Sequence, residues 1–321
     1  MIRFGSSGTH NDNPHFSEMV RVIQENRINV YLPPEELKDD FIDILKNLNA
    51  NIALSFLYSK IFPKKIISIF KDEMFNIHPS ALPKYRGAQP LYWQIRNGER
   101  KSALSIHKIS EKIDSGDIVG RIDFDIEKED TIGSLLNKIV MIVPQLIVEF
   151  CANLETDTLK YKKQDQSEYY ENPGDTDFKI DWKKDTTFEI SQKAKSSNPI
   201  YGGIDAVIKD IFIKVLEVTP VDNQTYGVKE GVIILIDEKD GLVVAAKNNT
   251  AIRLDVVSTK DGVFSGYSFA NPQNHFPVNN LKTVKEKKWR PILISETYHL
   301  WEFTYNPKGK GLYFPEPLLP I

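Results

Sequence analysis

Apolar residues along the first half of the chain recur with two different spacings, and segments of the two kinds alternate. A spacing of three or four residues, which is typical of amphipathic helices, marks residues 16–25, 34–47, 90–97 and 130–154. Short apolar or alternating runs, which are typical of strands, mark residues 28–32, 51–56, 74–77, 103–108 and 118–124. The alternation predicts an α/β fold with a doubly wound, mostly parallel sheet.

Beyond residue 155 the pattern changes. Charged and polar residues dominate residues 155–178, which predicts an exposed connector, and a helix is predicted over residues 186–195. Five short strands separated by turn residues are predicted at residues 206–208, 212–218, 231–237, 242–246 and 251–257. Because the intervening turns are typical of hairpins, this region is predicted to form a small OB-like β-barrel.

These patterns divide the chain into four predicted parts. An α/β domain is expected at residues 1–155, a linker at 156–202, the OB-like domain at 203–282 and a tail at 283–321. The chain has 321 residues, which is enough for two domains of ordinary size.

Composition excludes several classes of protein. The formal net charge of -3 gives no overall basic field for nucleic acid, although basic residues can still gather locally. The single cysteine, Cys151, excludes an internal disulfide framework, and its apolar helical surroundings predict a buried side chain. No apolar run approaches the roughly 20 residues of a membrane span, no Cys/His cluster has metal-ligand spacing, and the start of the chain has no signal-peptide pattern. We therefore expect a cytoplasmic protein with no membrane partner and no metal.

Two polar stretches carry the candidate chemistry. In residues 75–87, Asn76 and His78 are two positions apart on a predicted strand, so they share one side of it just before a loop rich in Pro and Gly. In residues 112–119, Asp114 lies in a turn that enters another predicted strand. Asn-x-His alone is more often an ordinary pair of satisfied side chains. The second stretch favours a site, because a carboxylate there would orient the imidazole and favour its charged form.

Together the two stretches resemble the signature of the formyltransferases that use 10-formyltetrahydrofolate. The family pattern is Asn-x-His-x-Ser-Leu-Leu-Pro-x-x-Arg-Gly, followed at a set distance by Asp-Thr-Gly-Asp. The chain keeps most of these positions: Asn76, His78, Ser80, Leu82, Pro83, Arg86, Gly87, Asp114, Gly116 and Asp117. Ala81 and Ser115 replace the usual Leu and Thr.

The resemblance implies that a formyl group moves from 10-formyltetrahydrofolate, a co-substrate, to an amine. It implies that Asn76 and a charged His78 stabilise the oxygen that becomes negative, while Asp114 holds the imidazolium and accepts the amine proton through water. It also implies folate contacts from two segments: Leu57, Tyr58, Ser59, Ile61, Ser110, Glu111, Ile113 and Asp117. Contacts with the acceptor are implied for Ser80, Lys84, Arg86 and Gly87. His107 has no matched role in the family and is expected to be structural.

The resemblance leaves the acceptor open. The length and two-domain plan favour charged initiator tRNA, whereas residues 90–93 and 97–99 are more similar to the branch that acts on nucleotide-linked amino sugars. Binding of tRNA would require cations to gather in one groove, with Lys84, Arg86 and the lysines and arginine between residues 282 and 310 as candidates.

A further alternative belongs to another class of protein. Residues 5–14 match the loop that follows the family's first β-α-β elements, so these elements are expected to be missing from the catalytic domain. Such a chain would be a non-catalytic binding or scaffold protein with a retained site. The intact Asn76, His78 and Asp114 argue against this alternative.

Overall fold

The computed structural model describes residues 21–28, 39–58, 60–71, 73–165, 168–208, 211–222, 225 and 227–271. Three predicted segments lie wholly or almost wholly outside these residues: the loop at 5–14, the strand at 28–32 and the tail at 283–321. Residues 21–25 are described, and they form the end of the predicted first helix. The chain divides into two compact units, one that runs to Phe75 and one that begins at Asn76.

The described elements of the first unit alternate between helix and strand. They are α2 (Asp39–Asn47), β1 (Ala53–Phe56), α3 (Lys64–Ile67), the 3-10 helix η2 (Ser68–Phe70) and the start of β2 (Met74–His78). Helix α2 buries Phe41 and Leu45 one turn apart, as its apolar spacing predicts. The pattern did not predict α3 and η2, whose apolar positions are too few to show a helical period.

The α/β sheet has the strand order β1-β2-β4-β5, in which β4 is Lys101–Lys108 and β5 is Ile118–Asp125. Strands β4 and β5 are antiparallel, with Lys101 opposite Asp125 and His107 opposite Ile118. A parallel pair needs a crossover of about a dozen residues or more, and the connection over residues 109–117 is too short for one. The predicted mostly parallel sheet therefore contains an antiparallel pair at this place.

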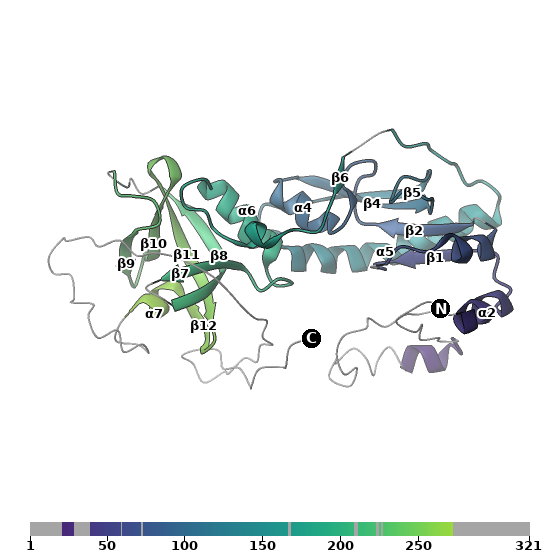
Figure 1. Cartoon of the computed structure of the whole chain (residues 1–321), viewed down its shortest axis with the longest axis horizontal. Coiled ribbons are helices and arrows are strands. Elements are labelled where there is room, and N and C mark those ends of the chain that lie inside the picture. The colour runs from purple at the N-terminus through teal and green to yellow at the C-terminus, as the bar shows by residue number, and fades with distance from the viewer. Residues whose placement is uncertain are drawn as a thin grey trace. The chain divides into compact units, whose positions relative to one another are not determined.

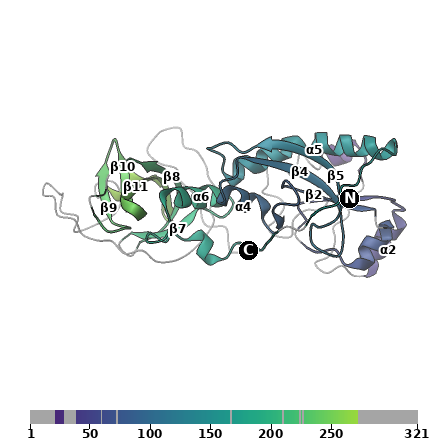
Figure 2. The ribbon, with the colours of Figure 1, turned by 90° about the horizontal axis from the view of Figure 1, so that it is seen from above.

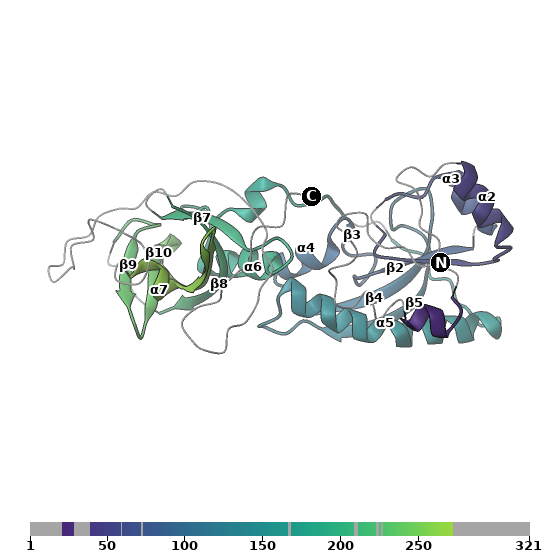
Figure 3. The same ribbon diagram turned by 90° about the horizontal axis from the view of Figure 1, so that it is seen from below.

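Two helices accompany these strands. Helix α4 (Pro90–Arg96) has a proline in its first turn, where the missing N–H leaves no unpaired donor. Helix α5 (Ile132–Glu155) begins at Thr131, whose hydroxyl accepts from the Ser134 amide while the Ser134 hydroxyl accepts from the Thr131 amide. Figures 1 and 3 show α5 running along β4 and β5. The stripe that it buries there is Ile132, Leu135, Ile139, Val143, Leu146 and Phe150.

Part of the opposite side of α5 is exposed and apolar. Met141 and Val148 are 81% and 68% exposed, and Cys151 is exposed as well. The predicted burial of Cys151 is therefore wrong, because this residue lies off the buried stripe. By length and composition alone α5 could cross a membrane, so the statement that no run approaches such a length is wrong for this helix.

The connector is more ordered than its polar composition suggests. Two-residue strands β3 (Arg86–Gly87) and β6 (Tyr169–Tyr170) pair in parallel, so the connector lies directly on the loop that follows β2. A 3-10 helix, η3 (Asp175–Phe178), and helix α6 (Thr187–Ser197) follow. Helix α6 contacts both α4 and β8 (Figure 2), and it starts with a capping box between Thr186 and Glu189.

The C-terminal region is an antiparallel β-sheet. Its strands are β7 (Ile204–Ile208), β8 (Ile211–Val221), β9 (Ile233–Asp237), β10 (Gly241–Ala246), β11 (Thr250–Thr259) and β12 (Gly262–Ser265), with η4 (Lys247–Asn249) and α7 (Gly266–Ala270). The order is β7-β8-β11-β10-β9, and β12 pairs with β11. Among the described residues the path has two end strands, β7 and β9, so closure into a barrel stays a prediction.

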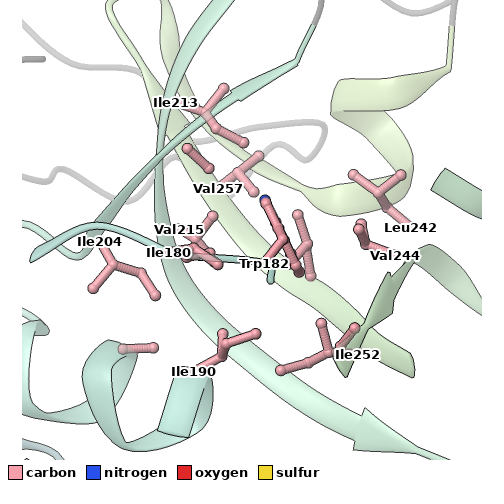
Figure 4. Packing of buried hydrophobic residues seen from close by; sticks show 14 of the residues in the cluster. Ile180, Trp182, Ile190, Ile204, Ile213, Val215, Leu242, Val244, Ile252 and Val257 are labelled. Atoms are coloured by element: carbon pink, nitrogen blue, oxygen red, sulfur yellow. The ribbon is translucent and has the colours of Figure 1, made fainter. Parts of the chain in front are cut away.

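The core of this region includes residues that precede its first strand. Ile180, Trp182 and Ile190 pack with side chains of the sheet such as Val215 and Val244 (Figure 4). Buried Lys193 pairs with Asp185 at 2.7 Å, which ties α6 to the turn after Trp182. The linker residues from Ile180 to α6 thus form part of the hydrophobic core of the β-sheet region.

Candidate active site

Strand β2 and its loop place Asn76 and His78. Both side chains point to the same side, as the alternation predicts, and they differ in exposure: His78 is 4% exposed whereas Asn76 is only partly buried. The loop is held from inside, because the Ser80 hydroxyl donates to the Lys84 carbonyl at 2.7 Å and the Ser105 hydroxyl donates to the Ser80 carbonyl at 2.7 Å. These bonds fix the path of the chain immediately after the two candidate side chains.

The turn after β4 brings Asp114 to the same place. One carboxylate oxygen of Asp114, Oδ2, lies 3.6 Å from His78 Nδ1 and accepts from the Gly87 amide at 2.9 Å. Its other oxygen, Oδ1, lies 3.3 Å from Nε2 of His107. The carboxylate therefore lies between two imidazoles, and Asn76 Nδ2 lies 3.3 Å from the second of them.

The surroundings of Asp114 favour the ionised carboxylate. Burial by itself would raise the pKa of this carboxyl, but a hydrogen bond from His107 when its ring is protonated, the positive charge of a protonated His78 and the Gly87 amide outweigh burial and lower its pKa. The backbone of Asp114 has φ +48°, a left-handed conformation that is uncommon for a residue with a Cβ. Residues in such conformations persist only where neighbouring contacts hold them.

The two nitrogens of His78 have different neighbours. Nε2 lies 2.8 Å from the carbonyl oxygen of Tyr85, and a carbonyl only accepts, so Nε2 carries a proton. Burial lowers the pKa of the imidazole, although the Asp114 carboxylate and the Tyr85 carbonyl oppose the shift. The resting ring is thus favoured as neutral, with the lone pair on Nδ1 facing Asp114. The charged His78 expected from the sequence is disfavoured by this burial.

His107 belongs to the cluster, although the sequence indicated only a structural residue. Its Nδ1 donates to the carbonyl of Lys108 at 2.9 Å, and its ring lies edge-on to His78 with centroids 6.2 Å apart. The sequence did contain one indication that His107 belongs to the site, because His107 lies on the strand that leads into the Asp114 turn. Without the register of β4 against β2 this residue could not be distinguished from a core histidine.

Gly87 connects the loop to Asp114 and is closely covered by the connector. With φ +102° it adopts a conformation that side chains disfavour, and an added Cβ would collide with the Tyr170 carbonyl and the Tyr169 ring. Its amide is the one that donates to Asp114 Oδ2. A residue larger than glycine would have to separate β3 from β6 and withdraw this amide.

Replacing Gly87 with alanine is therefore expected to destabilise the protein by more than the roughly 1–2 kcal/mol of an unfavourable φ alone, and to lower kcat at the same time. The matched control is Gly202→Ala, at φ +69° with nothing within 4 Å of the added Cβ. Urea unfolding of both variants separates the conformational cost from the steric cost. Equal losses of stability in the two variants would contradict the close β3–β6 contact.

The residues predicted to bind the acceptor are largely engaged by the protein. The Arg86 guanidinium donates to Gln164 Oε1 at 2.9 and 3.1 Å and to the Asp165 carbonyl at 2.9 Å. Ser80 is fully buried, and exposed Lys84 lies 3.8 Å from Glu99. In this arrangement Ser80 and Arg86 support the loop, and Lys84 is the cation of this set that faces solvent. The lysines beyond residue 271 lie outside the described residues.

The residues predicted to contact folate fall into two groups. Leu57 and Ile61 belong to the first unit and are 56% and 74% exposed, Tyr58 stacks on Phe62 with centroids 4.3 Å apart, and Ser59 lies outside the described residues. The second group lies in the Asp114 turn: Ser110, Glu111, Ile113 and Asp117. There the Ser110 hydroxyl donates to the Lys112 carbonyl at 3.0 Å, and Ile113 is 40% exposed. These folate contacts stay predictions.

No group of three or more His, Cys, Asp or Glu in the described part of the chain is arranged to hold a metal ion. A cavity of about 670 Å³ lies beside the turn after Trp182 and is lined by residues of the linker and the approach to β9, among them Lys179 and Lys229. No predicted site residue lines this cavity.

Comparison with known proteins agrees with the family that the two motifs resemble. Residues 9–150 match the model of the formyl transferase family, and residues 174–273 match the model of the formyl transferase C-terminal domain. A methionyl-tRNA formyltransferase of Prochlorococcus marinus is 30% identical over 243 residues, which cover 69% of this chain and 73% of that protein. The chain belongs to the formyl transferase family.

Two further similarities bear on this formyl transferase family member. A methionyl-tRNA formyltransferase of Rickettsia rickettsii is 33% identical over 193 residues, or 60% of this chain, and the chain spans 63% of that relative's length. The crystal structure of HypX from Aquifex aeolicus in complex with tetrahydrofolic acid superposes with a TM-score of 0.60 at 16% identity, covering 93% of this chain and 51% of HypX. At this identity the second similarity shows a shared fold.

Proposed function

We propose that this chain transfers a formyl group from 10-formyltetrahydrofolate to a primary amine, with methionyl-tRNA as the acceptor. The observation that carries the proposal is the Asp114 carboxylate held between His78 and His107, with the Asn76 amide beside them. The names of the relatives at 30% and 33% identity support tRNA as acceptor. The tetrahydrofolic acid bound by HypX supports folate as the donor of the formyl group.

The reaction requires three things of the site. The amine nitrogen attacks the formyl carbon, and the formyl oxygen becomes negative in the tetrahedral intermediate. One proton must leave the attacking nitrogen, and N10 of the folate must receive a proton as the bond from carbon to N10 breaks. The site must therefore stabilise the formyl oxygen, accept the proton of the amine and deliver a proton to N10. One hydrogen-bond donor meets the first requirement, and a single group that accepts and then returns a proton meets the other two.

Asn76 is the donor in this proposal. Its side chain is partly accessible, whereas His78 is almost fully buried, and its amide carries two N–H groups of which one faces His107. The second N–H is available for the formyl oxygen. Fixed donors of this kind stabilise an oxyanion without reorganisation during the reaction.

His78 is the group that accepts and returns the proton. Since Nε2 already donates to Tyr85, Nδ1 is the nitrogen that can accept the amine proton. The imidazolium that forms lies 3.6 Å from the Asp114 carboxylate, which stabilises it. The proton then passes from Nδ1 to N10 of the leaving folate. This assignment reverses the role expected from the sequence, in which a charged His78 donates to the formyl oxygen.

The remaining parts of the proposal rest on the sequence. The C-terminal sheet is offered as an OB-like domain that contributes to acceptor binding. The folate contacts are offered as the sequence implies them: Leu57, Tyr58, Ser59, Ile61, Ser110, Glu111, Ile113 and Asp117. A cytoplasmic location fits the single cysteine of the chain.

A formylation assay tests the function directly. The full chain is incubated with 10-formyltetrahydrofolate and, in parallel, with methionyl-tRNA or with a nucleotide-linked amino sugar. Formyl transfer to methionyl-tRNA is the expected result. Transfer to the sugar alone would show that the acceptor is a nucleotide-linked amino sugar, which residues 90–93 and 97–99 favour, and not methionyl-tRNA. Folate binding without transfer to either acceptor would indicate a binding protein with a retained site.

The salt dependence of acceptor binding is expected to be steep. Each phosphate that the protein neutralises adds roughly 0.7 to 0.9 to the slope of log affinity against log salt, and a tRNA contact involves several phosphates. A nucleotide sugar presents one diphosphate and gives a shallow slope. Titration of the protein with methionyl-tRNA at several salt concentrations measures the slope, and a nearly flat line would argue against tRNA.

A further inference from the structure

The connector after α5 crosses both loops of the site. We use the name connector strap for residues 160–165 and 168–171. At its start Lys162 and Ile118 exchange two backbone hydrogen bonds of 2.8 and 2.9 Å, which anchors the strap to the first residue of β5. At its end the Tyr170 carbonyl accepts from the Ala88 amide at 2.8 Å, next to the β3–β6 pair. The strap is thus fixed to the Asp114 side and to the Arg86 side of the site.

Between these anchors Gln164 joins the two loops through both ends of its amide. Its Oε1 accepts from Nε and Nη2 of Arg86, at 3.1 and 2.9 Å. Its Nε2 donates to the carbonyl of Asp114 at 3.1 Å and to the carbonyl of Gly116. One half-buried side chain therefore uses its acceptor on one loop and both its donor hydrogens on the other.

The Asp114 turn has need of this support. Asp114 has φ +48°, and at Gly116 an added Cβ would collide with the Lys108 carbonyl, so the turn is both tight and strained. A strained turn relaxes where its backbone loses partners, and the Asp114 side chain would move with its backbone. An error of about 1 Å at a reacting group can lower a rate by about 100-fold.

We propose that Gln164 is a positioning residue, which holds the Asp114 carboxylate at its distance from His78 by tying the Asp114 turn to Arg86. The proposal rests on the proposed function for its effect on catalysis, but its geometric content does not depend on which acceptor is used. It also explains why the guanidinium of Arg86 is directed at the strap rather than into solvent. Nothing in the two sequence motifs indicates Gln164, because it follows Arg86 by 78 positions.

The test uses the titration of His78 in the full chain without substrate, followed by NMR of the imidazole and assigned with His78→Gln. The titratable groups that act on the pKa of His78 are Asp114 and His107, and the Tyr85 carbonyl accepts a hydrogen bond from its Nε2. Gln164→Met removes all the amide contacts without adding charge. If the Asp114 carboxylate moves away, the imidazolium loses its counter-charge, and the titration shifts to lower pH by about half a unit or more. In the assay kcat falls by about 100-fold where the carboxylate moves by about 1 Å.

The matched control is Gln145→Met, at an exposed position of α5, and it should leave the titration and kcat unchanged. Gln164→Asn keeps an amide that is too short to reach both loops, so it serves where the Met variant does not fold, and it should shift the titration in the same direction. An unmoved titration in folded protein overturns the proposal, as does a kcat that falls only with the folded fraction. A wild-type protein that transfers no formyl group refutes the proposed function, while the titration still decides the part played by Gln164.

Discussion

Asp114→Asn is expected to lower kcat by about 100- to 10,000-fold, the range typical for loss of a group that assists proton transfer. The amide keeps the size of the carboxylate, but it cannot stabilise the imidazolium that forms when His78 accepts the amine proton. Because the pKa of Asp114 is lowered, the carboxylate is ionised at neutral pH and its charge is what the substitution removes. Steady-state formylation at saturating folate measures the effect.

The same variant should change the pH dependence in a defined direction. Burial already lowers the pKa of His78 below its ordinary value of 6.5, and the carboxylate of Asp114 raises it in opposition. His78 must be neutral to accept a proton, so the wild-type rate falls as the pH drops through this lowered pKa. Without Asp114 the pKa falls further, and the acid limb of kcat moves to lower pH. If the reaction instead required a charged His78, the rate would fall as the pH rises.

The control for both measurements is Asp123→Asn on β5, where the carboxylate is exposed and pairs with Arg121 at 2.6 Å. It removes one negative charge from the same domain and should leave kcat and its pH profile unchanged. An Asp114→Asn protein that is folded and formylates at the wild-type rate would remove Asp114 from the mechanism.

Sequence pattern was sufficient where local chemistry decides the structure. The alternation of residues 74–78 requires that Asn76 and His78 share one side of β2, and the apolar stripe of α5 fixes the face that it buries. The turn that holds Asp114 was predicted from the residues that compose it, although its left-handed backbone was not. In each case the determining contacts lie within a few residues, so the pattern carries the information.

Contacts between distant segments were not available from the pattern. His107 lies beside Asn76 only because of the order of β2 and β4 in the sheet, and Gln164 reaches Arg86 only because the connector turns back over the site. Trp182 joins the core of a sheet whose strands begin at β7. Polar composition predicted an exposed connector. Such composition does not distinguish a solvated segment from one whose polar groups are hydrogen-bonded to the protein, so the contacts of the connector could not be predicted.

Asn76→Ala should also reduce kcat by about 100- to 1,000-fold, because the formyl oxygen loses its donor. Binding of a stable formyl folate should change little, since the donor acts mainly on the charge that develops during the reaction. The control is Asn137→Ala, at an exposed position of α5. A folded Asn76→Ala protein that keeps the wild-type kcat would show that the oxygen is stabilised elsewhere.

His107 determines how the Asn76 amide is held. Since its Nδ1 donates to the Lys108 carbonyl, a neutral His107 ring can only accept at Nε2, and the amide of Asn76 lies 3.3 Å away as the donor. A protonated ring would instead donate from Nε2 to Asp114 Oδ1, at 3.3 Å, and release the amide. His107→Ala should lower kcat about 10-fold in wild-type protein and by less in the Asn76→Ala background, because part of its effect passes through Asn76. Equal losses in the two backgrounds would show that His107 acts through Asp114 alone.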